Sequence, residues 1–417
     1  MVPPSRHPDR RTLWGAYAIG LFGMGYIDVF SFLIPLYAID LNMSATEVGM
    51  LVGFRTVLTL IFSIHIGTLM DRFGTLRVMK ICTLFGMVLA PIYPLTDSFF
   101  GLLILQILVG GAVSFGWAGG QTLIAQITGG DAEYIGRFSF ASRVGTTIAP
   151  LVAGAIWDFG GAWPGYLLGF AWGVVLMITL CIAPATPEVT GSETKNSQPV
   201  PFRQLLPRLN DYTRSFAMML VPIIAVSMAV MFMRNSTSGI QNSIYVVYLE
   251  GVGLTGTMIG VLFAVIEGAS GLGSLLGGRV MRMADPRWTL VNGTSFAIMA
   301  IVVTPVFVWL SPTMAILVSL LVISQFVRGV VQGLTQPVMF SVQSQAVPLN
   351  QQGSVVGLRQ TINRASAILV PPIMGLFADY WGIAESFLIL GAVLLGMCGV
   401  IMIWVYKTSP KKQRNSI

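Results

Sequence analysis

A series of long apolar runs constrains this chain more than any other feature. A helix that crosses the hydrocarbon core of a bilayer needs about 20 apolar residues. Hydrophobic residues make up 54% of the 417 residues, and charged residues only 10%. Since a helix satisfies its own backbone hydrogen bonds in lipid, the sequence predicts an all-α membrane protein. Its twelve transmembrane helices are expected at residues 13–39, 47–70, 76–95, 99–127, 137–157, 163–184, 216–249, 256–281, 288–310, 313–345, 354–379 and 382–406.

The basic residues are distributed unevenly between the two ends of these spans. Eighteen of the 24 Lys and Arg residues lie in loops and tails on one expected side of the membrane. The loops on the other side hold no base and seven acids, which are Asp40, Glu47, Asp97, Asp158, Glu250, Asp379 and Glu385. Basic loops stay in the cytoplasm. We therefore expect a protein of the cell inner (plasma) membrane, embedded in the lipid bilayer, with both termini cytoplasmic.

The chain divides into two similar halves of six expected helices each, residues 1–184 and 215–417, joined by a polar cytoplasmic linker, residues 185–214. A shift of 211 residues aligns Thr46 with Thr257 and Gly49 with Gly260. A shift of 221 residues aligns Arg143 with Arg364, Pro150 with Pro371, Gly154 with Gly375, Asp158 with Asp379 and Gly161 with Gly382. Six helices per half give both halves the same orientation, which predicts parallel repeats around a central cavity.

The loop between the second and third expected helices carries a motif. It reads G-T-L-M-D-R-F-G-T-L-R from Gly67 to Arg77 and resembles the Gly-x-Leu-Ala-Asp-Arg-x-Gly signature of the major facilitator superfamily. The resemblance covers essentially the whole chain and implies a secondary transporter that works by alternating access without a cofactor. It also implies a gating motif, in which Asp71 meets the eleventh helix in the outward-facing state. The motif consists of Gly67, Asp71, Arg72, Gly74 and Arg77.

The fourth and fifth expected helices also bear on this resemblance. The fifth expected helix carries Gly145, Pro150 and Gly154, a partial match to the glycine–proline pattern of many exporters in the family. The fourth helix usually carries an arginine near its middle. Here Gln106 takes that place, and Arg328 occupies the comparable place in the tenth helix.

Eight charged residues lie inside the expected membrane core, where a charge is costly and therefore faces a cavity or a partner. Two are acids, Asp28 and Glu267, and six are arginines, Arg55, Arg143, Arg234, Arg328, Arg359 and Arg364. An excess of positive charge disfavours cationic cargo. The planar guanidinium binds oxyanions through two parallel hydrogen bonds. The sequence therefore predicts a small organic anion as the substrate.

Depth along the helices suggests how these charges pair. With a rise of 1.5 Å per residue, Asp28 lies roughly 22 Å and Arg55 roughly 18 Å from the cytoplasmic side, whereas Arg234 and Glu267 both lie at roughly 15 Å. We expect the ion pairs Asp28–Arg55 and Arg234–Glu267, and either acid as the proton carrier. The residues expected to bind the substrate are Arg143, Arg364, Arg328, Arg234, Gln241 and Asn242.

Arg143 and Arg364 form the sharpest of these hypotheses. Each precedes a helix proline by seven residues, Pro150 or Pro371. Parallel repeats place such positions on opposite walls of the cavity, so that two guanidiniums hold one anion between them. The alternative is that each arginine caps carbonyl groups of a neighbouring helix near the cytoplasmic mouth.

Three other interpretations stay open. The intramembrane arginines can hold helices together through Asp28, Glu267 or helix C-terminal carbonyls. A proton-driven drug or metabolite efflux pump, with Asp28 trading a proton for lipophilic cargo, suits a chain with 22 Met and 24 Phe. A receptor that kept the fold without transporting is the third.

The sequence also predicts several absences. It shows no metal-ligand cluster, P-loop or nucleophile elbow, so we expect neither an enzyme nor a metal site. The net charge of +7 is spread over short loops and does not form one basic face, so we expect no nucleic-acid partner. The expected partners are protons, lipid and the small-molecule anion, and the expected oligomeric state is a monomer.

Overall fold

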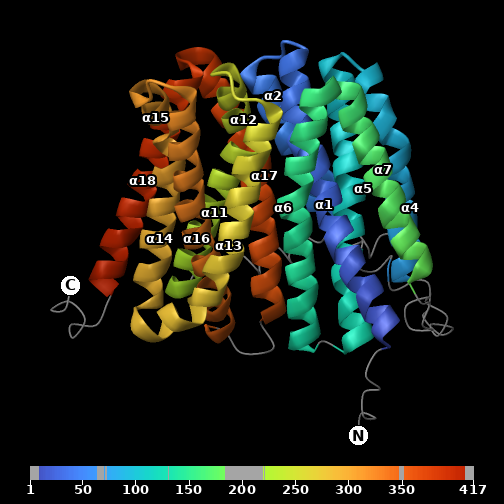
Figure 1. Cartoon of the computed structure of the whole chain (residues 1–417). Coiled ribbons are helices and arrows are strands. Elements are labelled where there is room, and N and C mark those ends of the chain that lie inside the picture. Colours follow the sequence, from blue (N-terminus) through green and yellow to red (C-terminus); the bar gives the residue numbers. More distant parts are fainter. Residues whose placement is uncertain are drawn as a thin grey trace, which may run out of the picture. The chain divides into compact units, whose positions relative to one another are not determined.

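The computed structural model describes residues 9–62, 70, 73–129, 131–183, 219, 221–346 and 352–408. Within these ranges the chain is helical apart from short turns, and they contain no strand. Figure 1 shows the helices coloured along the sequence. The elements of the first half are α1 (Arg10–Asp40), α2 (Ala45–Phe54), α4 (Thr75–Leu89), the 3₁₀ helix η1 (Ala90–Leu95), α5 (Phe99–Thr128), α6 (Ala132–Gly160) and α7 (Ala162–Ile182).

The second half continues the same pattern of long helices. Its elements are α11 (Pro222–Gln241), α12 (Ile244–Gly251), α13 (Gly256–Met283), α14 (Pro286–Val302), α15 (Thr304–Leu310), α16 (Met314–Gln345), α17 (Gln352–Trp381) and α18 (Ile383–Thr408). The prediction of an all-α fold is confirmed. The expected linker, residues 185–214, lies outside the described residues.

Most of these helices have the length and composition of membrane spans. Among the described residues, ten helices are long and apolar enough to cross a membrane, or eleven if α14 and α15, bent by 41°, form one span. The remaining expected span is α6, which has 29 residues but is not among them. It carries Ser139, Ser142, Thr146 and Thr147 beside Arg143. A helix of this composition fits a polar interior better than a lipid-facing position.

The chain folds into two compact units, which do not coincide with the halves of the sequence. Unit 1 comprises Met1–Met43, Met50–Pro207 and Gly253–Ala264, and unit 2 comprises Ser44–Gly49, Arg208–Val252 and Val265–Ile417. The first residues of α2 therefore belong to unit 2, and the first residues of α13 belong to unit 1. The division at residues 184 and 215 stays a prediction from the sequence.

Helix pairs that occupy equivalent places in the two halves of the sequence pack together in both units. In unit 1, α1 packs against α6, and α4 packs against α5 and α7. In unit 2, α11 packs against α17, and α14 packs against α16 and α18. These pairs hold equivalent places in the two halves of the sequence, so each unit repeats the packing of the other.

Local sequence signals explain where several helices begin and end. Ser98 caps α5 by accepting a hydrogen bond from the Gly101 N–H at 3.2 Å, which satisfies one of the free donors of a helix start. The repeated glycines Gly161 and Gly382 separate α6 from α7 and α17 from α18, with φ of 69° and 98°. A side chain at either position would be strained in this left-handed region.

Two long spans are interrupted at residues that the sequence singles out. The span Ala45–Phe62 contains a turn at Arg55 and Thr56. The span Pro222–Gly251 is broken between α11 and α12, at Asn242 and Ser243. Irregular backbone at membrane depth occurs where it is buried in protein or lines a cavity. Both interruptions therefore point to the protein interior.

Candidate functional site

An extensive buried polar network surrounds Arg328 on α16, in unit 2. The Arg328 side chain is fully buried, with 0% of its surface exposed. Its Nη1 donates to Gln241 Oε1 at 2.6 Å and to Gln325 Oε1 at 3.1 Å. Its Nη2 donates to the Thr237 carbonyl at 3.2 Å. All three acceptors are uncharged, so these hydrogen bonds hold the guanidinium in place without cancelling its charge.

The position of Arg328 relative to α11 explains part of its stability. Gln241 is the last residue of α11, and Thr237 lies directly before the last turn. The carbonyl groups at a helix C-terminus carry partial negative charge and are stabilised by a nearby cation, typically by about 0.3–1 kcal/mol. The interpretation that intramembrane arginines bind helix C-terminal carbonyls therefore applies to Arg328. Arg328 is also fully buried in this conformation, and its predicted contact with a substrate stays a prediction.

The network extends from Arg328 in two directions. Gln325 uses its Nε2 to donate to the Tyr245 hydroxyl at 2.6 Å. Gln332 donates through its Nε2 to Thr237 Oγ1 at 3.3 Å. Because Gln325 accepts from Arg328 and donates to Tyr245, its amide orientation is set by both partners. The result is a hydrogen-bonded polar layer that joins α11, α12 and α16.

Arg234 and Glu267 lie close enough to this layer for their charges to act on Arg328. Glu267 attracts the Arg328 guanidinium, and Arg234 repels it. Arg234 is half-buried on α11, and its Nη2 donates to Gln336 Oε1 at 3.4 Å. The group thus contains two cations and one anion, with a net positive charge. The predicted Arg234–Glu267 ion pair stays a prediction.

Asn242 marks the point where α11 ends. Its backbone N–H donates to the Ser238 carbonyl at 3.0 Å, and its side chain is half-buried. Neighbouring Gln241 is buried and bonded to Arg328. The two polar residues predicted to bind the substrate, Gln241 and Asn242, therefore differ in their surroundings. Gln241 orients Arg328, whereas Asn242 lies at the helix break.

A second polar group lies in unit 1, where Asp28 on α1 acts electrostatically on Arg55. Tyr93 also acts on Arg55, and its hydroxyl donates to Gln106 Oε1 at 3.0 Å. The Tyr93 ring stacks on Tyr166 with centroids 4.5 Å apart, which fixes the hydroxyl beside the charges. The two residues of the predicted Asp28–Arg55 pair thus share one polar group, and the ion pair itself stays a prediction.

The two arginines of the predicted clamp belong to different units. Arg143 lies on α6 in unit 1, and Arg364 lies on α17 in unit 2, and both side chains are half-buried. Their helices hold equivalent places, since α6 packs on α1 as α17 packs on α11. The clamp itself stays a prediction from the repeat.

The gating motif lies mostly outside the described residues. Gly67, Asp71 and Arg72 fall there. Gly74 is described, with φ of 86°, directly before the start of α4. Arg77 lies in the first turns of α4 and is exposed. Gly74 thus fits a position that favours glycine.

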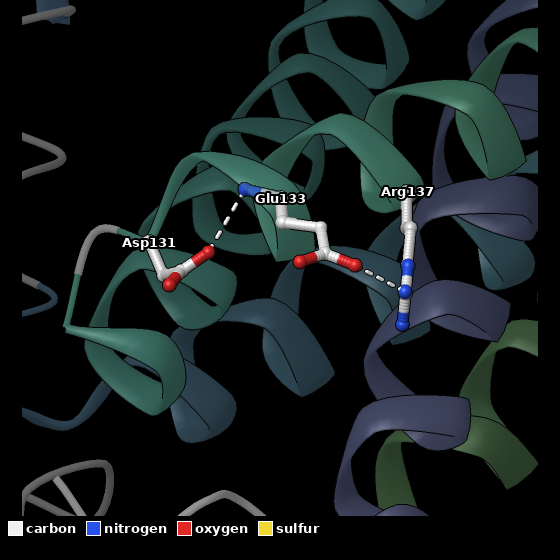
Figure 2. A network of polar contacts seen from close by, with 3 residues as sticks. All are labelled: Asp131, Glu133 and Arg137. Atoms are coloured by element: carbon white, nitrogen blue, oxygen red, sulfur yellow. Dashed lines mark hydrogen bonds and ion pairs between the residues drawn. The ribbon is translucent and has the colours of Figure 1, made fainter.

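A largely apolar groove of about 570 Å³ lies in unit 1 between α1 and α6, with Trp14 and Phe140 among its lining residues. Figure 2 shows the polar contacts at the start of α6, where Asp131 accepts from the Glu133 N–H at 2.8 Å and Glu133 pairs with Arg137. This ion pair is exposed and contributes at most about 1 kcal/mol. None of the predicted substrate residues lines the groove, so we do not assign it to the candidate site.

Sequence reasoning missed several residues of the Arg328 network, namely Thr237, Tyr245, Gln325 and Gln332. A partial signal was present, because Gln325, Arg328 and Gln332 recur at helical spacing on α16 and so share one face. The partners Thr237 and Tyr245 come from α11 and α12 and carry no such signal.

A family model described as Major Facilitator Superfamily matches residues 13–327 and 229–417. Two curated relatives are each 26% identical to part of the chain. The probable 4-methylmuconolactone transporter of Cupriavidus pinatubonensis aligns over 129 residues, 31% of this chain and 30% of the relative. The probable sulfoacetate transporter SauU of Cupriavidus necator aligns over 163 residues, 39% of this chain and 36% of the relative. The chain thus spans about a third of the length of these relatives.

Solved structures share the fold over nearly the whole chain. A mutant of the nucleoside transporter NupG has a TM-score of 0.76 at 14% identity, covering 94% of this chain and 99% of that chain. A bacterial homologue of the human lysosomal transporter Spinster, inward-facing and occupied, has a TM-score of 0.73 at 16% identity, covering 97% and 98%. At such low identity the likeness establishes the fold alone.

Proposed function

Because the chain belongs to the major facilitator superfamily, we propose that it is a secondary active transporter that moves a small organic anion by alternating access. The observation that carries the choice of an anion is the charge of the Arg328 group. Among the described residues whose charges act on Arg328, Glu267 attracts it and Arg234 repels it, so these three residues comprise two cations and one anion. An arriving anion restores neutrality in a medium of low dielectric constant, where such interactions are strong.

The roles within this group follow from burial. Arg328 is enclosed and bonded to Gln241, Gln325 and Thr237, so it acts as a positioning residue and a fixed source of positive potential. Arg234 is half-buried and is the better candidate for direct contact with a carboxylate or sulfonate. Asn242, at the helix break, can donate an uncharged hydrogen bond to the same anion.

The curated relatives support an organic acid as cargo. They are described as probable transporters of 4-methylmuconolactone and of sulfoacetate. Both compounds carry an acidic group at neutral pH. The six arginines expected inside the membrane supply fixed positive charge that attracts an anion.

We assign proton coupling to Asp28 or Glu267. Each acid acts electrostatically on an arginine, Asp28 on Arg55 and Glu267 on Arg328. Protonation of such an acid removes its negative charge. The positive charge of the arginine is then no longer offset and attracts an anion more strongly. Binding of the proton and binding of the anion are thereby linked.

The proposed setting is the inner membrane, with cytoplasmic termini and a monomeric protein. The distribution of Lys and Arg supports this orientation. Single cysteines near residues 42, 97, 158, 251 and 380, in a background without Cys82, Cys181 and Cys398, should react with an impermeant thiol reagent in intact cells. Reaction only after lysis would reverse the orientation.

The transport proposal is tested with purified protein in proteoliposomes. A thermal-shift screen of organic anions, with sulfoacetate as the first probe, should identify compounds that raise the melting temperature. Uptake of such a compound should then follow an imposed proton gradient and stop when a protonophore is added. If lipophilic cations raise the melting temperature and organic anions do not, the efflux-pump alternative is supported instead.

A further inference from the structure

The carboxylate of Asp158, near the end of α6, binds the first residues of α13 within unit 1. Oδ1 accepts from the Gly256 N–H at 2.7 Å, and Oδ2 accepts from the Thr257 N–H at 2.8 Å. The Thr257 hydroxyl also donates to Oδ2, at 2.5 Å. A carboxylate at this place satisfies free N–H donors and faces the positive end of the helix dipole.

The same arrangement occurs a second time, in unit 2. Asp379, near the end of α17, accepts through Oδ1 from the Ala45 N–H and through Oδ2 from the Thr46 N–H, both at 2.9 Å. Asp379 follows Asp158 by 221 residues, and Thr257 follows Thr46 by 211 residues. These are the two shifts that align the halves of the sequence, so both partners of the contact recur.

Glycines bring the backbones together beside each carboxylate. An added Cβ would lie 2.2 Å from the Gly256 carbonyl oxygen if placed on Gly154, and 2.2 Å from the Ala45 carbonyl oxygen if placed on Gly375. One turn further along, a Cβ on Gly260 would lie 2.6 Å from the Pro150 carbonyl oxygen. A Cβ on Gly49 would lie closer still to the matching Pro371 carbonyl oxygen, at 2.3 Å. Each carboxylate thus sits at the end of a glycine-lined backbone contact.

We infer that Asp158 and Asp379 are paired latches, which hold α6 to α13 and α17 to α2 at the outward end and must release before this end opens. The inference rests on the proposed function, because alternating access requires helices from the two halves of the sequence to separate at each end in turn. Asp158 and Gly256 come from different halves, as do Asp379 and Ala45. Each latch therefore joins chain segments that the transport cycle pulls apart.

The chemistry suits a contact that forms and breaks repeatedly. Both carboxylates are exposed, so water replaces the lost hydrogen bonds when a latch opens, and no charge is stranded in an apolar medium. Helix N-terminal N–H groups bind a carboxylate without needing a basic partner. This explains how acidic residues can hold the outward end together although the expected outward loops contain no Lys or Arg.

The two latches should differ in strength. Both carboxylates accept two backbone hydrogen bonds. Asp158 gains more at the first latch, from the Thr257 hydroxyl and from the Thr255 side chain. Asp158→Asn should therefore favour the open outward end more than Asp379→Asn. Thr257→Val removes only the hydroxyl bond and should bring the first latch close to the strength of the second.

The test measures the distance between spin labels at Phe159 and Met258 in the full chain, purified and free of substrate. Both positions are exposed, and Cys82, Cys181 and Cys398 are replaced first. Asp158→Asn should raise the ratio of long to short distances by about tenfold, the scale of losing one charge-assisted hydrogen bond. Asp379→Asn should raise the same ratio by a smaller factor.

The effect of Asp379→Asn is the decisive observation, because Asp379 lies in unit 2 and both labels report on a junction in unit 1. A carboxylate that only caps its own neighbouring helix would leave this distance unchanged. Asp97→Asn, an exposed acid of the expected outward loops, is the matched control and should have no effect. If Asp158→Asn does not fold, Thr257→Val with Asp379→Asn provides the same test.

An unchanged distance distribution in the double variant Thr257→Val, Asp379→Asn would overturn the latch. Since the measurement needs no substrate, it is independent of which compound is carried. A normal shift in distance without uptake of any anion would sink the proposed cargo and leave the latch standing. Proton-driven anion uptake without a shift in the label distance would overturn the latch and leave the proposed function standing.

Discussion

Arg328 Nη1 lies 2.6 Å from Gln241 Oε1, and this hydrogen bond joins a fully buried cation to the last turn of α11. The acceptor is an amide, so the bond orients the guanidinium and leaves its charge in the membrane interior. The break between α11 and α12 follows directly, at Asn242 and Ser243. The buried arginine and the irregular backbone thus support one another.

Replacing Arg328 by lysine should destabilise the protein. Lysine keeps the charge but loses the planar fork, so acceptors among Gln241, Gln325 and Thr237 lose their donor. Leaving one buried acceptor unsatisfied costs about 1–3 kcal/mol of unfolding free energy. Thermal or denaturant unfolding in detergent measures the loss. Arg137→Lys, in an exposed ion pair, is the control and should change stability by less than about 0.5 kcal/mol.

Replacing either clamp arginine should weaken anion binding. Arg143→Lys and Arg364→Lys should each cost about 1–3 kcal/mol of binding free energy, the scale of a hydrogen bond to a charged group. Both variants should reach the membrane in normal amounts. Calorimetry with an anion identified by the thermal-shift screen measures the effect. Arg137→Lys, on α6 like Arg143, is again the control. Unchanged affinity in both variants would sink the clamp.

Asp28 and Arg55 should depend on each other for stability. Asp28→Asn leaves Arg55 without its acid, at a cost of up to about 3–5 kcal/mol for a desolvated pair. Both residues are half-buried overall, but Asp28 Oδ2 and Arg55 Nη1 are themselves buried, so we expect much of this loss. The double variant Asp28→Asn, Arg55→Gln should recover part of it, as a double-mutant cycle of unfolding free energies would measure. If Asp28 carries the proton, the double variant folds but fails to concentrate substrate.

Glycine at position 154 should be needed for close packing. In a helix interior, Gly→Ala ordinarily stabilises by about 0.5–1 kcal/mol. A Cβ on Gly154 would lie 2.2 Å from a carbonyl oxygen, so Gly154→Ala should destabilise the latched form. Gly268→Ala, where no atom lies within 4 Å of the added Cβ, should be neutral or stabilising. Equal melting temperatures for the two variants would contradict this contact.

The sequence predicted the helical architecture because lipid leaves few alternatives. Backbone groups in the hydrocarbon core must be satisfied within the chain, so long apolar runs become helices. The motif between Gly67 and Arg77 and the repeated positions identified the family, which the family model confirms. The helix ends at Gly161 and Gly382 also follow from local sequence, since each has a φ that favours glycine.

The partners of the polar residues were decided by tertiary structure alone. Arg328 stood out in the sequence as a charge inside the expected membrane core, and packing encloses it and gives it Gln241, Gln325 and Thr237 as partners. Asp158 and Asp379 stood out in the sequence only as repeated acids, and their contacts with the starts of α13 and α2 emerged from the fold. Apolar periodicity and local turn residues determine where each helix runs. Which side chain meets which depends on how helices distant in the sequence pack, and no local pattern encodes that.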